Sequence, residues 1–556
     1  MQVVNYSSYR KKALSYQLKQ YSIPASRGLI DAYEGDQTVP IVLNQVLYTL
    51  YADPPLIKNV NKSAAKVASV IGGNVLTYEQ DMKVKHTQYV IMAKKLTSAQ
   101  SKKLLSFKLP GVGTQGQDYR IYPQGNLAAQ VLGFVNSNGV GEYGIEQALN
   151  PQLAGTPGRV KAVTDASGVP LAATKGNIEV PPKNGDNVVL TLDVGMQAQV
   201  ENILKKEYKA TKSQGLSAII MDPYNGQIKA MANYPTYNPA NYQNVSNPSV
   251  YQNAAVDYPI EPGSIMKTLT TPTALNLGVI QPDTSFYDPA HWVINGFNIH
   301  DIKQDGGPRE QNIASILALS LNTGAVWMLM QMGGGHIDKT GIDHWYQYMT
   351  QHYRLGKPTG IQQGYEAGGY VPPPNMSDPT IDLRYANTAF GQGVQVTALQ
   401  MVTALSSVLN GGTYYKPNLV SKIVKPNGST QVIKPKIEEK NVVSPKVSRE
   451  MVPLMENVVK SYLHFGFNFM NFSSKYIVGG KTGTAQVARP TGGYYKNIYN
   501  GSYIGFVGGN KIQYVLIVYN IKPATPGYAG SYAAQPVFAD LVHMLINEGY
   551  VNPKTN

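Results

Sequence analysis

Hydrophobic positions are arranged differently in the middle of the chain and toward its end. Apolar runs typical of strands lie at residues 188–192, 217–221, 227–232, 499–508 and 513–519. Helical patterns predominate from 264 to 411, and further helices are expected over 195–210 and 535–547. Strands so far apart in sequence share a sheet only after the chain folds back on itself. The pattern therefore predicts an α+β architecture.

The first part of the chain has a more mixed pattern. It predicts a basic helix at 9–19, a strand at 41–51 and a short basic helix at 98–107. Residues 109–158 are rich in Gly, Asn and Pro, so mainly loops with short helices are expected there.

The clearest turn signal in the first half is Pro181-Pro182-Lys183-Asn184-Gly185-Asp186. A chain of 556 residues is too long for one hydrophobic core. We therefore expect two domains, an N-terminal domain with a mixture of helices and strands over 1–185 and a C-terminal domain over 186–556.

Composition and charge narrow the class of protein. With 43% apolar and 15% charged residues, the chain is globular and not disordered. The 48 lysines and arginines outnumber the 34 acidic residues, which gives a net charge of +14. These bases are scattered along the sequence without interleaved stacking aromatics, so no nucleic-acid partner is predicted. An anionic envelope surface or polymer is an equally physical partner.

Several kinds of site and segment are excluded. The absence of cysteine excludes disulfides and thiolate metal sites, and the few histidines show no ligand spacing, so no metal is expected. No apolar run approaches the roughly 18 residues of a membrane helix. Residues 1–21 are too polar for a secretory signal.

The main candidate for chemistry is Ser264-Ile265-Met266-Lys267. Pro262 and Gly263 interrupt the preceding chain, and the following pattern predicts a helix from Ser264 to Leu277. Three residues are about one turn, so Lys267 is expected beside Ser264. A lysine acts as a base toward serine when burial or a second cation lowers its pKa. Free N–H groups of the first turn would stabilise an oxyanion.

The same spacing occurs a second time. Ser63-Ala64-Ala65-Lys66 also reads Ser-x-x-Lys, but no Pro-Gly break precedes it. A short motif recurs by chance, and we interpret this copy as part of a solvent-exposed helix face.

A second candidate is Ser320-Leu321-Asn322. It follows a helical run at 313–319 and precedes Thr323-Gly324, which we interpret as an exposed turn. The Ser320 hydroxyl suits proton transfer, and the Asn322 amide suits binding to a peptide group. Taken alone, this short match is better interpreted as a polar turn between helices.

A third candidate is Lys481-Thr482-Gly483-Thr484, which follows the strand-like residues 476–480. On a strand, Lys481 and Gly483 share one face while Thr482 and Thr484 share the other. A glycine lets a substrate backbone lie close, and the hydroxyls and the ammonium suit a carboxylate. Lys339-Thr340-Gly341 repeats the triplet without a strand pattern, so we interpret it as a loop between helices.

In this order, Ser-x-x-Lys, Ser-x-Asn and Lys-Thr-Gly are the signature set of penicillin-binding proteins and class A β-lactamases. The chain resembles a class B penicillin-binding protein, a monofunctional peptidoglycan D,D-transpeptidase. Ile23 to Asp31 is similar to the Arg-Gly segment of that family, Gly141 to Glu146 to its pedestal motif, and Ala389 to Thr397 to its Gly-Gln-Gly stretch.

The resemblance implies a β-lactamase-like transpeptidase domain, with a central antiparallel sheet flanked by helices, above a pedestal domain of the dimerisation type. It implies that Ser264 attacks a D-alanine carbonyl, that Lys267 accepts its proton, and that Ser320 relays a proton to the leaving nitrogen. Asn322 would bind the substrate amide, and Lys481 would act electrostatically on the serine cluster.

The same resemblance assigns substrate binding to the third motif. Thr482 and Thr484 would bind the terminal carboxylate beside Gly483, and the N–H groups of Ser264 and Thr484 would form the oxyanion hole. No metal or organic cofactor is implied. Expected partners are peptidoglycan stem peptides, β-lactam antibiotics, a membrane glycosyltransferase, and division or elongation proteins.

In that family, a membrane helix precedes the pedestal and the enzyme acts outside the cytoplasmic membrane. Residues 1–6 begin where that helix would have ended. We therefore expect a protein of the extracytoplasmic face of the bacterial cell membrane, with its N-terminal anchor missing from this chain.

Two other functions stay open at this stage. A D,D-carboxypeptidase or β-lactamase needs a base for water. Glu438-x-x-Asn441 formally offers an acidic candidate, which we discount because it lies in a lysine-rich linker at 434–440. A β-lactam sensor or scaffold would keep the fold without turnover.

The aromatic side chains of residues 465–472 suit either a lip over the site or local packing, and we favour packing.

Overall fold

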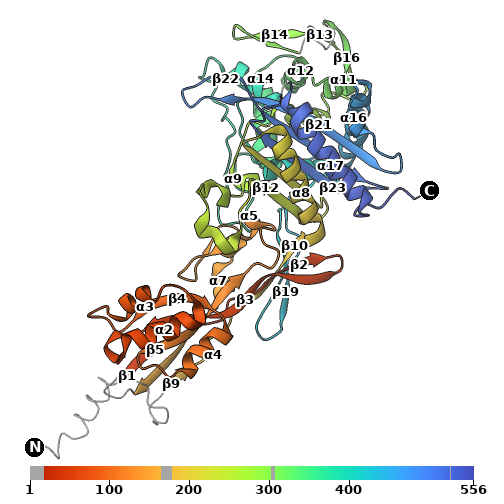
Figure 1. Cartoon of the computed structure of the whole chain (residues 1–556). Coiled ribbons are helices and arrows are strands. Elements are labelled where there is room, and N and C mark those ends of the chain that lie inside the picture. Colours follow the sequence, from red (N-terminus) through yellow and green to blue (C-terminus); the bar gives the residue numbers. More distant parts are fainter. Residues whose placement is uncertain (1–17, 164–177, 302–306, 526, 556) are drawn as a thin grey trace, which may run out of the picture.

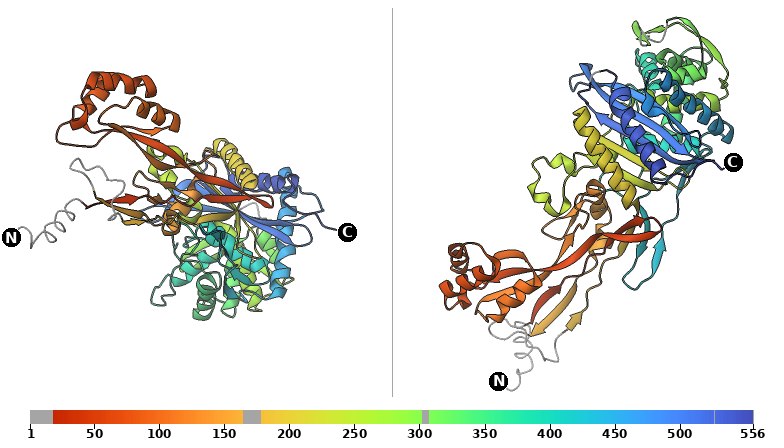
Figure 2. Two further views of the ribbon diagram at one scale, coloured as in Figure 1. Left: turned by 90° about the horizontal axis from the view of Figure 1, so that it is seen from below. Right: turned by 45° about the vertical axis from the view of Figure 1, so that its right-hand side comes forward.

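The computed structural model describes residues 18–163, 178–301, 307–525 and 527–555. The molecule is elongated: a large C-terminal body stands on a thin N-terminal part that ends in a small separate lobe (Figures 1 and 2). The helix expected at 9–19 lies almost wholly outside the described residues. Among the described residues, no helix has the length and hydropathy needed to span a bilayer.

A five-stranded antiparallel sheet forms the centre of the body. Its order is β12 (Ile228–Tyr234), β11 (Gly215–Met221), β23 (Ile512–Ile521), β22 (Tyr494–Gly508) and β21 (Ile477–Ala488). The predicted meeting of distant strands is confirmed by the pairing of β11 with β23. All five strands have long buried apolar stretches, because both faces of the sheet are covered by helices.

Helices α8 (Val194–Thr211) and α17 (Gln535–Asn547) pack together on one face of this sheet (Figure 1). Helices α10 (Lys267–Asn276), α15 (Ala398–Leu409) and α16 (Pro445–His464) form a second packed group against it. Every residue of α15 is buried, as expected for a helix surrounded by others. The α+β prediction is therefore confirmed.

The remaining helices of the body follow the chain around this core. They are α9 (Ala254–Asp257), α11 (Ile313–Ala318), α12 (Asn322–Met332), α13 (Lys339–Gln347) and α14 (Ile381–Ala389). Single turns are η2 (Pro239–Asn244), η3 (Pro248–Tyr251), η4 (Gly263–Met266), η6 (Tyr348–His352), η7 (Asn468–Met470) and η8 (Gly530–Ala534).

Short strand pairs interrupt the helices where the sequence predicted almost none. They are β13 (Ser285–Asp288) with β16 (Arg309–Asn312), β14 (His291–Ile294) with β15 (Phe297–His300), and β17 (Thr413–Tyr415) with β20 (Ile437–Lys440). The interpretation of 434–440 as a linker is wrong for its second half, because Glu439 and Lys440 pair with β17.

A second sheet joins the N-terminal part to the body. Its order is β19 (Thr430–Val432), β18 (Val420–Val424), β10 (Asn187–Asp193), β2 (Ile30–Glu34), β3 (Gln37–Ala52) and β4 (Val90–Leu96), with β5 (Val112–Ile121) also on β3. β10 runs parallel to β2 and antiparallel to β18. Strands from both sides of residues 181–186 thus share one sheet, and the division at 185 stays our proposal.

The ten-residue strand β5 was not predicted, since 109–158 was expected to be mainly loops. It pairs with β3 from Val112 to Ile121. Its glycines fit this position: a side chain at Gly113 would collide with the ring of Tyr51, at 2.5 Å. Tertiary pairing therefore overrides a weak local preference.

Other elements of the N-terminal part are short. They are β1 (Leu18–Ile23), β6 (Phe134–Val135), β7 (Gly141–Glu142), β8 (Gly158–Val163), β9 (Ile178–Val180), η1 (Pro54–Leu56), α2 (Val60–Ile71), α3 (Val75–Met82), α4 (Ser98–Ser106), α5 (Ala129–Leu132), α6 (Gly144–Ala148) and α7 (Asn150–Ala154). The helix expected at 98–107 and the strand expected at 41–51 are confirmed as α4 and β3.

A small lobe, which we call the head, comprises residues 53–110. Helices α2, α3 and α4 pack with the ends of β3 and β4 around their own hydrophobic core, separate from that of the body (Figure 1). The second Ser-x-x-Lys copy lies on α2: Lys66 is exposed as predicted, but Ser63 is buried against this core.

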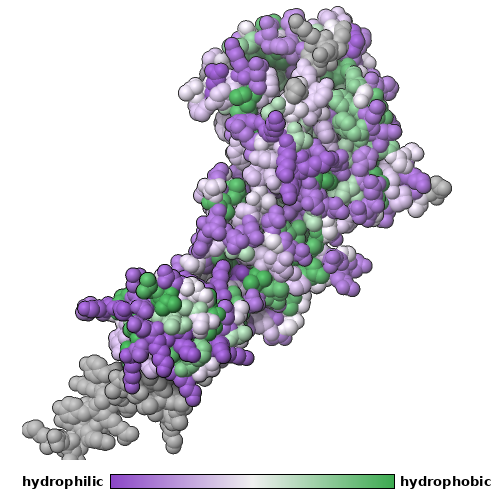
Figure 3. Space-filling view, viewed as in Figure 1, coloured by the Kyte–Doolittle hydropathy of each residue, from purple (hydrophilic) through white to green (hydrophobic). Residues whose placement is uncertain are grey.

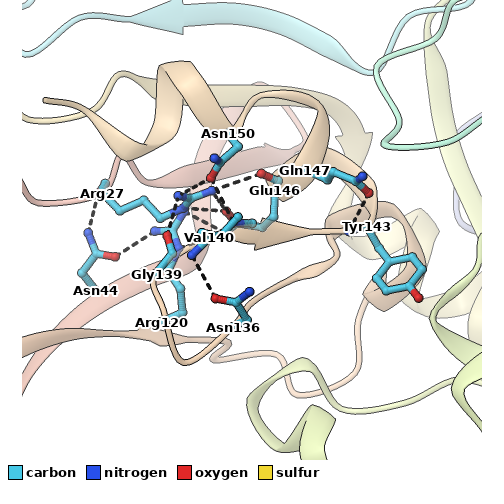
Figure 4. A network of polar contacts seen from close by, with 11 residues as sticks. Arg27, Asn44, Arg120, Asn136, Gly139, Val140, Tyr143, Glu146, Gln147 and Asn150 are labelled. Atoms are coloured by element: carbon cyan, nitrogen blue, oxygen red, sulfur yellow. Dashed lines mark hydrogen bonds and ion pairs between the residues drawn. The ribbon is translucent and has the colours of Figure 1, made fainter.

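A buried ionic network holds the pedestal motif in place (Figure 4). The carboxylate of Glu146, fully buried on α6, accepts from Nε of Arg27 at 2.7 Å and from Nε of Arg120 at 2.9 Å. Nη1 of Arg27 donates to Asn150 at 2.8 Å, and Nη1 of Arg120 donates to Asn44 at 2.8 Å. The network joins the segment before β2 to β3, β5, α6 and α7.

Candidate active site

Ser264 lies on the single 3₁₀ turn η4, which leads directly into α10. The helix therefore begins three residues after the predicted start, and it continues through Pro272 to Asn276. Gly263 has φ +64° and faces the backbone of Thr484, where a Cβ would lie 2.8 Å from the carbonyl oxygen. Only glycine combines this backbone conformation with so close an approach.

Lys267 connects the first motif to the second. Its side chain is fully buried, and Nζ donates to Oγ of Ser264 at 3.1 Å and to Oδ1 of Asn322 at 2.9 Å. Nζ also lies 3.4 Å from Oγ of Ser320 and donates to the Ser320 carbonyl. The side chains of Ser264, Ser320 and Asn322 thus lie around the amine of Lys267. All four residues were predicted as site residues from these two motifs.

Ser320 occupies a sharp bend between α11 and α12, with φ +62°. Asn322 is the first residue of α12, so the interpretation of Thr323-Gly324 as an exposed turn is wrong: both residues are buried within this helix. The reason is packing, since a side chain at Gly324 would lie 2.5 Å from Ile316 of α11. The glycine lets the two helices approach closely.

Asp301 supports the second motif and was not predicted. One carboxylate oxygen accepts from the backbone N–H of Asn322 at 2.5 Å and of Thr323 at 3.1 Å, while the other accepts from the Thr323 hydroxyl. Burial raises the pKa of Asp301, against the effect of its hydrogen bonds with Thr323. The carboxylate caps the N-terminus of α12 and so fixes the place where Asn322 begins the helix.

The third motif lies on β21, at the edge of the central sheet. The predicted alternation is confirmed: Lys481 and Gly483 are buried, while Thr482 and Thr484 are half-buried. Nζ of Lys481 donates to the Thr482 carbonyl at 3.1 Å and lies 3.4 Å from its hydroxyl. The hydroxyl of Thr484 accepts from the N–H of Gly530 at 2.9 Å.

Gly483 brings the first and third motifs together. A Cβ there would lie 2.5 Å from the carbonyl oxygen of Pro262 and 2.3 Å from Oγ of Ser502. Ser502 in turn donates to the Pro262 carbonyl at 2.7 Å. The turn that carries Ser264 therefore occupies the space beside this glycine, where the sequence predicted a substrate backbone.

Glu261, three residues before Ser264, is a further site residue that the sequence analysis missed. Its Oε1 accepts from the N–H of Gly393 at 2.9 Å and from the hydroxyl of Tyr494 at 3.0 Å. The backbone adds a third link, because Gly263 N–H donates to the Gly391 carbonyl at 3.0 Å. The Gly-Gln-Gly stretch and the start of β22 thus hold the turn that carries Ser264.

Comparison with known families agrees with this geometry. The pattern of the penicillin binding protein transpeptidase domain matches residues 216–543, and that of the penicillin-binding protein dimerisation domain matches residues 22–190. The first match alone covers more than half of the chain. The chain belongs to the class B penicillin-binding proteins.

Two relatives illustrate the range of similarity. Stage V sporulation protein D of Bacillus subtilis is 30% identical over 93% of this chain and 78% of its own length. Peptidoglycan D,D-transpeptidase FtsI of Escherichia coli K12 is 24% identical over 100% of this chain and 89% of its own length. The recognition made from the three motifs is therefore confirmed.

Solved structures show the same fold. Penicillin Binding Protein 2X from Streptococcus thermophilus superposes with a TM-score of 0.77 at 22% identity, covering 96% of this chain and 80% of that one. Penicillin binding protein 3 from Mycobacterium tuberculosis, complexed with aztreonam, gives 0.72 at 23% identity, covering 96% and 98%. The predicted transpeptidase fold with an N-terminal dimerisation-type domain is thus confirmed.

Two other candidates from this penicillin-binding protein sequence have ordinary surroundings. Glu438 pairs with Lys436 at 2.7 Å and with Arg354 at 3.5 Å, and these cations lower its pKa. Lys339-Thr340-Gly341 is the first turn of α13, not a loop, because Asp338 caps it by accepting from the Gly341 N–H at 2.8 Å.

The aromatic segment 465–472 makes several packing contacts. Phe467 lies against Tyr462, Phe469 and Tyr532, with ring centroids 5.7 to 6.1 Å apart. Phe465 is 57% exposed, so part of the segment faces solvent. Because Tyr462 also accepts a hydrogen bond from the N–H of Thr482 at 3.3 Å, this packing extends to the third motif.

Proposed function

We propose that this chain is a serine D,D-transpeptidase that crosslinks peptidoglycan stem peptides and is acylated by β-lactams. The observation that carries the proposal is the contact of Lys267 Nζ with Oγ of Ser264 and Oδ1 of Asn322, at 3.1 and 2.9 Å. A buried amine beside a hydroxyl on a helix-opening turn is an arrangement suited to nucleophilic acyl transfer.

In the first step, Ser264 Oγ attacks the carbonyl carbon of the penultimate D-alanine, and its proton passes to Lys267. The carbonyl oxygen becomes an oxyanion that the N–H groups of Ser264 and Thr484 stabilise. Collapse of the tetrahedral intermediate breaks the peptide bond, and Ser320 relays a proton to the leaving D-alanine nitrogen. An ester on Ser264 and free D-alanine result.

Substrate binding falls to the remaining residues. Asn322 binds the stem-peptide amide, while Thr482 and Thr484, beside Gly483, bind the terminal carboxylate. We assign to Lys481, which is 1% exposed, a positive charge that attracts the carboxylate and acts electrostatically on the pair of Ser264 and Lys267.

In the second step, an amine of another stem peptide attacks the ester. The new amide bond forms as the ester bond breaks, and the amine proton returns to Ser264 through the same lysine. A β-lactam acylates Ser264 by opening its own ring. Neither step uses a metal or an organic cofactor.

The setting of this reaction is the extracytoplasmic face of the bacterial cell membrane. Its substrate occurs there, and we infer that the protein is attached to this membrane. Partners would be a membrane glycosyltransferase, which supplies glycan strands, and proteins of division or elongation. The domains that serve this function are 1–185 as pedestal and 186–556 as transpeptidase.

An exchange assay tests the proposal. The protein is incubated with a donor peptide ending in D-Ala-D-Ala and an excess of an amine acceptor, and mass spectrometry quantifies the products. We expect the new amide product and released D-alanine, both lost in Ser264→Ala. Hydrolysed donor without amide product would instead indicate a carboxypeptidase, and an acylated protein without D-alanine release would indicate a sensor.

A further inference from the structure

Positive charge is concentrated in the head. Residues 53–110 contain ten lysines, three acidic residues and no arginine, so ten minus three gives a net charge of +7. This is half of the +14 carried by all 556 residues. The bases are therefore less evenly scattered than the linear sequence suggested, and the head is the cationic end of the molecule.

All ten lysines of the head have exposed side chains: Lys58, Lys62, Lys66, Lys83, Lys85, Lys94, Lys95, Lys102, Lys103 and Lys108. Within the described residues, only Lys83 among them forms an ion pair, with Glu79 at 3.4 Å. So many uncompensated like charges on one small lobe repel one another and destabilise it. A binding partner of opposite charge would relieve this repulsion.

Large apolar side chains are exposed between these lysines. The most exposed are Leu76 on α3, at 63%, Leu56 on η1, at 57%, and Leu105 on α4, at 50%; Val84, Tyr89 and Ile91 follow at 43 to 46%. Figure 3 shows hydrophobic areas beside strongly hydrophilic ones on the head, at the lower left of the molecule. The head therefore offers both charge and apolar contact.

We propose that the head docks on an anionic lipid bilayer. Clustered lysines near a membrane surface are attracted electrostatically to anionic headgroups. Exposed leucines among them would enter the boundary between headgroups and acyl chains. The head lies at the opposite end of the molecule from β21, the strand that carries the third motif (Figure 1). The inference does not depend on transpeptidase activity.

The use of lysine alone favours a lipid surface over a protein partner. Protein interfaces with energetic hot spots are rich in arginine, which binds carboxylates with two parallel hydrogen bonds. Lysine is a hydrated point charge on a flexible stem, suited to diffuse attraction by a fluid surface. A soluble polyanion would use the same charges but would gain nothing from Leu76 and Leu105.

Vesicle flotation with the full chain tests the docking. We expect binding to vesicles of phosphatidylcholine containing 30% phosphatidylglycerol, and at least tenfold weaker binding to phosphatidylcholine alone. The variant with Lys62, Lys85, Lys94 and Lys102 each changed to Gln should bind the anionic vesicles at least tenfold more weakly. These four lysines make no ring or ion-pair contact in the described structure, so the head should still fold.

A matched variant separates local charge from net charge. Lys209, Lys425, Lys434 and Lys460 are exposed and lie outside the head. Changing these four to Gln removes the same charge and should leave vesicle binding within twofold of the wild type. Equal losses in both variants, or wild-type binding in the head variant, would overturn the proposal.

A second pair of measurements separates lipid from other partners. Leu76→Ser with Leu105→Ser should weaken vesicle binding at least threefold while leaving retention on immobilised polyphosphate unchanged. Retention on polyphosphate without any vesicle binding would overturn the lipid assignment. Penicillin acylation at the wild-type rate in every variant would show that the body is folded.

Discussion

The hydroxyl of Tyr494 donates a hydrogen bond of 3.0 Å to Oε1 of Glu261, across 233 residues of sequence. The other carboxylate oxygen of Glu261 is buried and has no hydrogen-bond partner among the described residues, and burial raises the pKa of this group. Oε1 also accepts from Gly393. One side chain thus links the turn that carries Ser264 to the start of β22 and to the Gly-Gln-Gly stretch.

Tyr494→Phe should slow acylation by a fluorescent penicillin about tenfold. The variant removes one of the two hydrogen bonds that the Glu261 carboxylate accepts. A hydrogen bond to a charged group contributes about 1.5–3 kcal/mol, so its loss should loosen the turn before Ser264. Stopped-flow measurement of the second-order rate constant checks this, with exposed Tyr495→Phe as the control. An unchanged rate in Tyr494→Phe would mean that the link does not position the nucleophile.

Lys267→Ala should lower the acylation rate constant by roughly 10²–10⁴, the range lost with a general base. It would also leave Asn322 without its 2.9 Å donor. Lys66→Ala is the matched control, because Lys66 holds the same place in the second Ser-x-x-Lys copy but is exposed on the head. Comparable losses in both variants would contradict the assignment of the base.

Glu146→Ala should destabilise the N-terminal part by about 3–5 kcal/mol, since it leaves the buried Arg27 and Arg120 without their carboxylate. Burial already lowers the pKa of Arg27. Urea unfolding measures the change. The surface ion pair of half-buried Glu79 with exposed Lys83 gives the comparison, and Glu79→Ala should cost less than about 1 kcal/mol. Similar values for the two variants would contradict the structural role of the network.

The raised pKa of Asp257 predicts that the stability of the protein depends on pH. Burial raises its pKa to about 7, and it lines a cavity of about 350 Å³ that also includes Glu142. The folded state therefore holds this proton more tightly than the unfolded state, whose carboxyl group titrates near 3.8. The contribution to stability is present at low pH and is lost as the pH rises toward about 7.

Asp257→Asn removes this dependence. We expect its Tm to exceed that of the wild type by roughly 2 °C at pH 8, which corresponds to about 1 kcal/mol after allowance for solvent screening of a half-buried group. At pH 4 the two proteins should melt together. A difference that does not change with pH would show that Asp257 does not titrate in this range.

The elements predicted correctly from sequence are those with a strong local pattern. Helix α17 and the strands β11 and β12 have clear apolar patterns, and all three formed as expected. Strand β5 and the small strand pairs between 285 and 312 have no such pattern, because long-range pairing decides their conformation.

In the site as well, contacts between residues close in sequence were predicted, and contacts between distant residues were not. Ser264 and Lys267 lie one turn apart, so their contact follows from helix geometry. Asp301 reaches the second motif from 21 residues away, and Tyr494 reaches Glu261 from 233 residues away. No spacing rule connects residues that meet only after folding, which is why the supporting carboxylates were missed.

The central claim is that Ser264 is the nucleophile. Intact-mass spectrometry after incubation with a fluorescent penicillin tests it on the wild type, Ser264→Ala and Ser63→Ala. We predict one covalent adduct on the wild type and on Ser63→Ala, none on Ser264→Ala, and slow loss of the adduct over time. An adduct that persists in Ser264→Ala, or no adduct on folded wild type, would contradict the account.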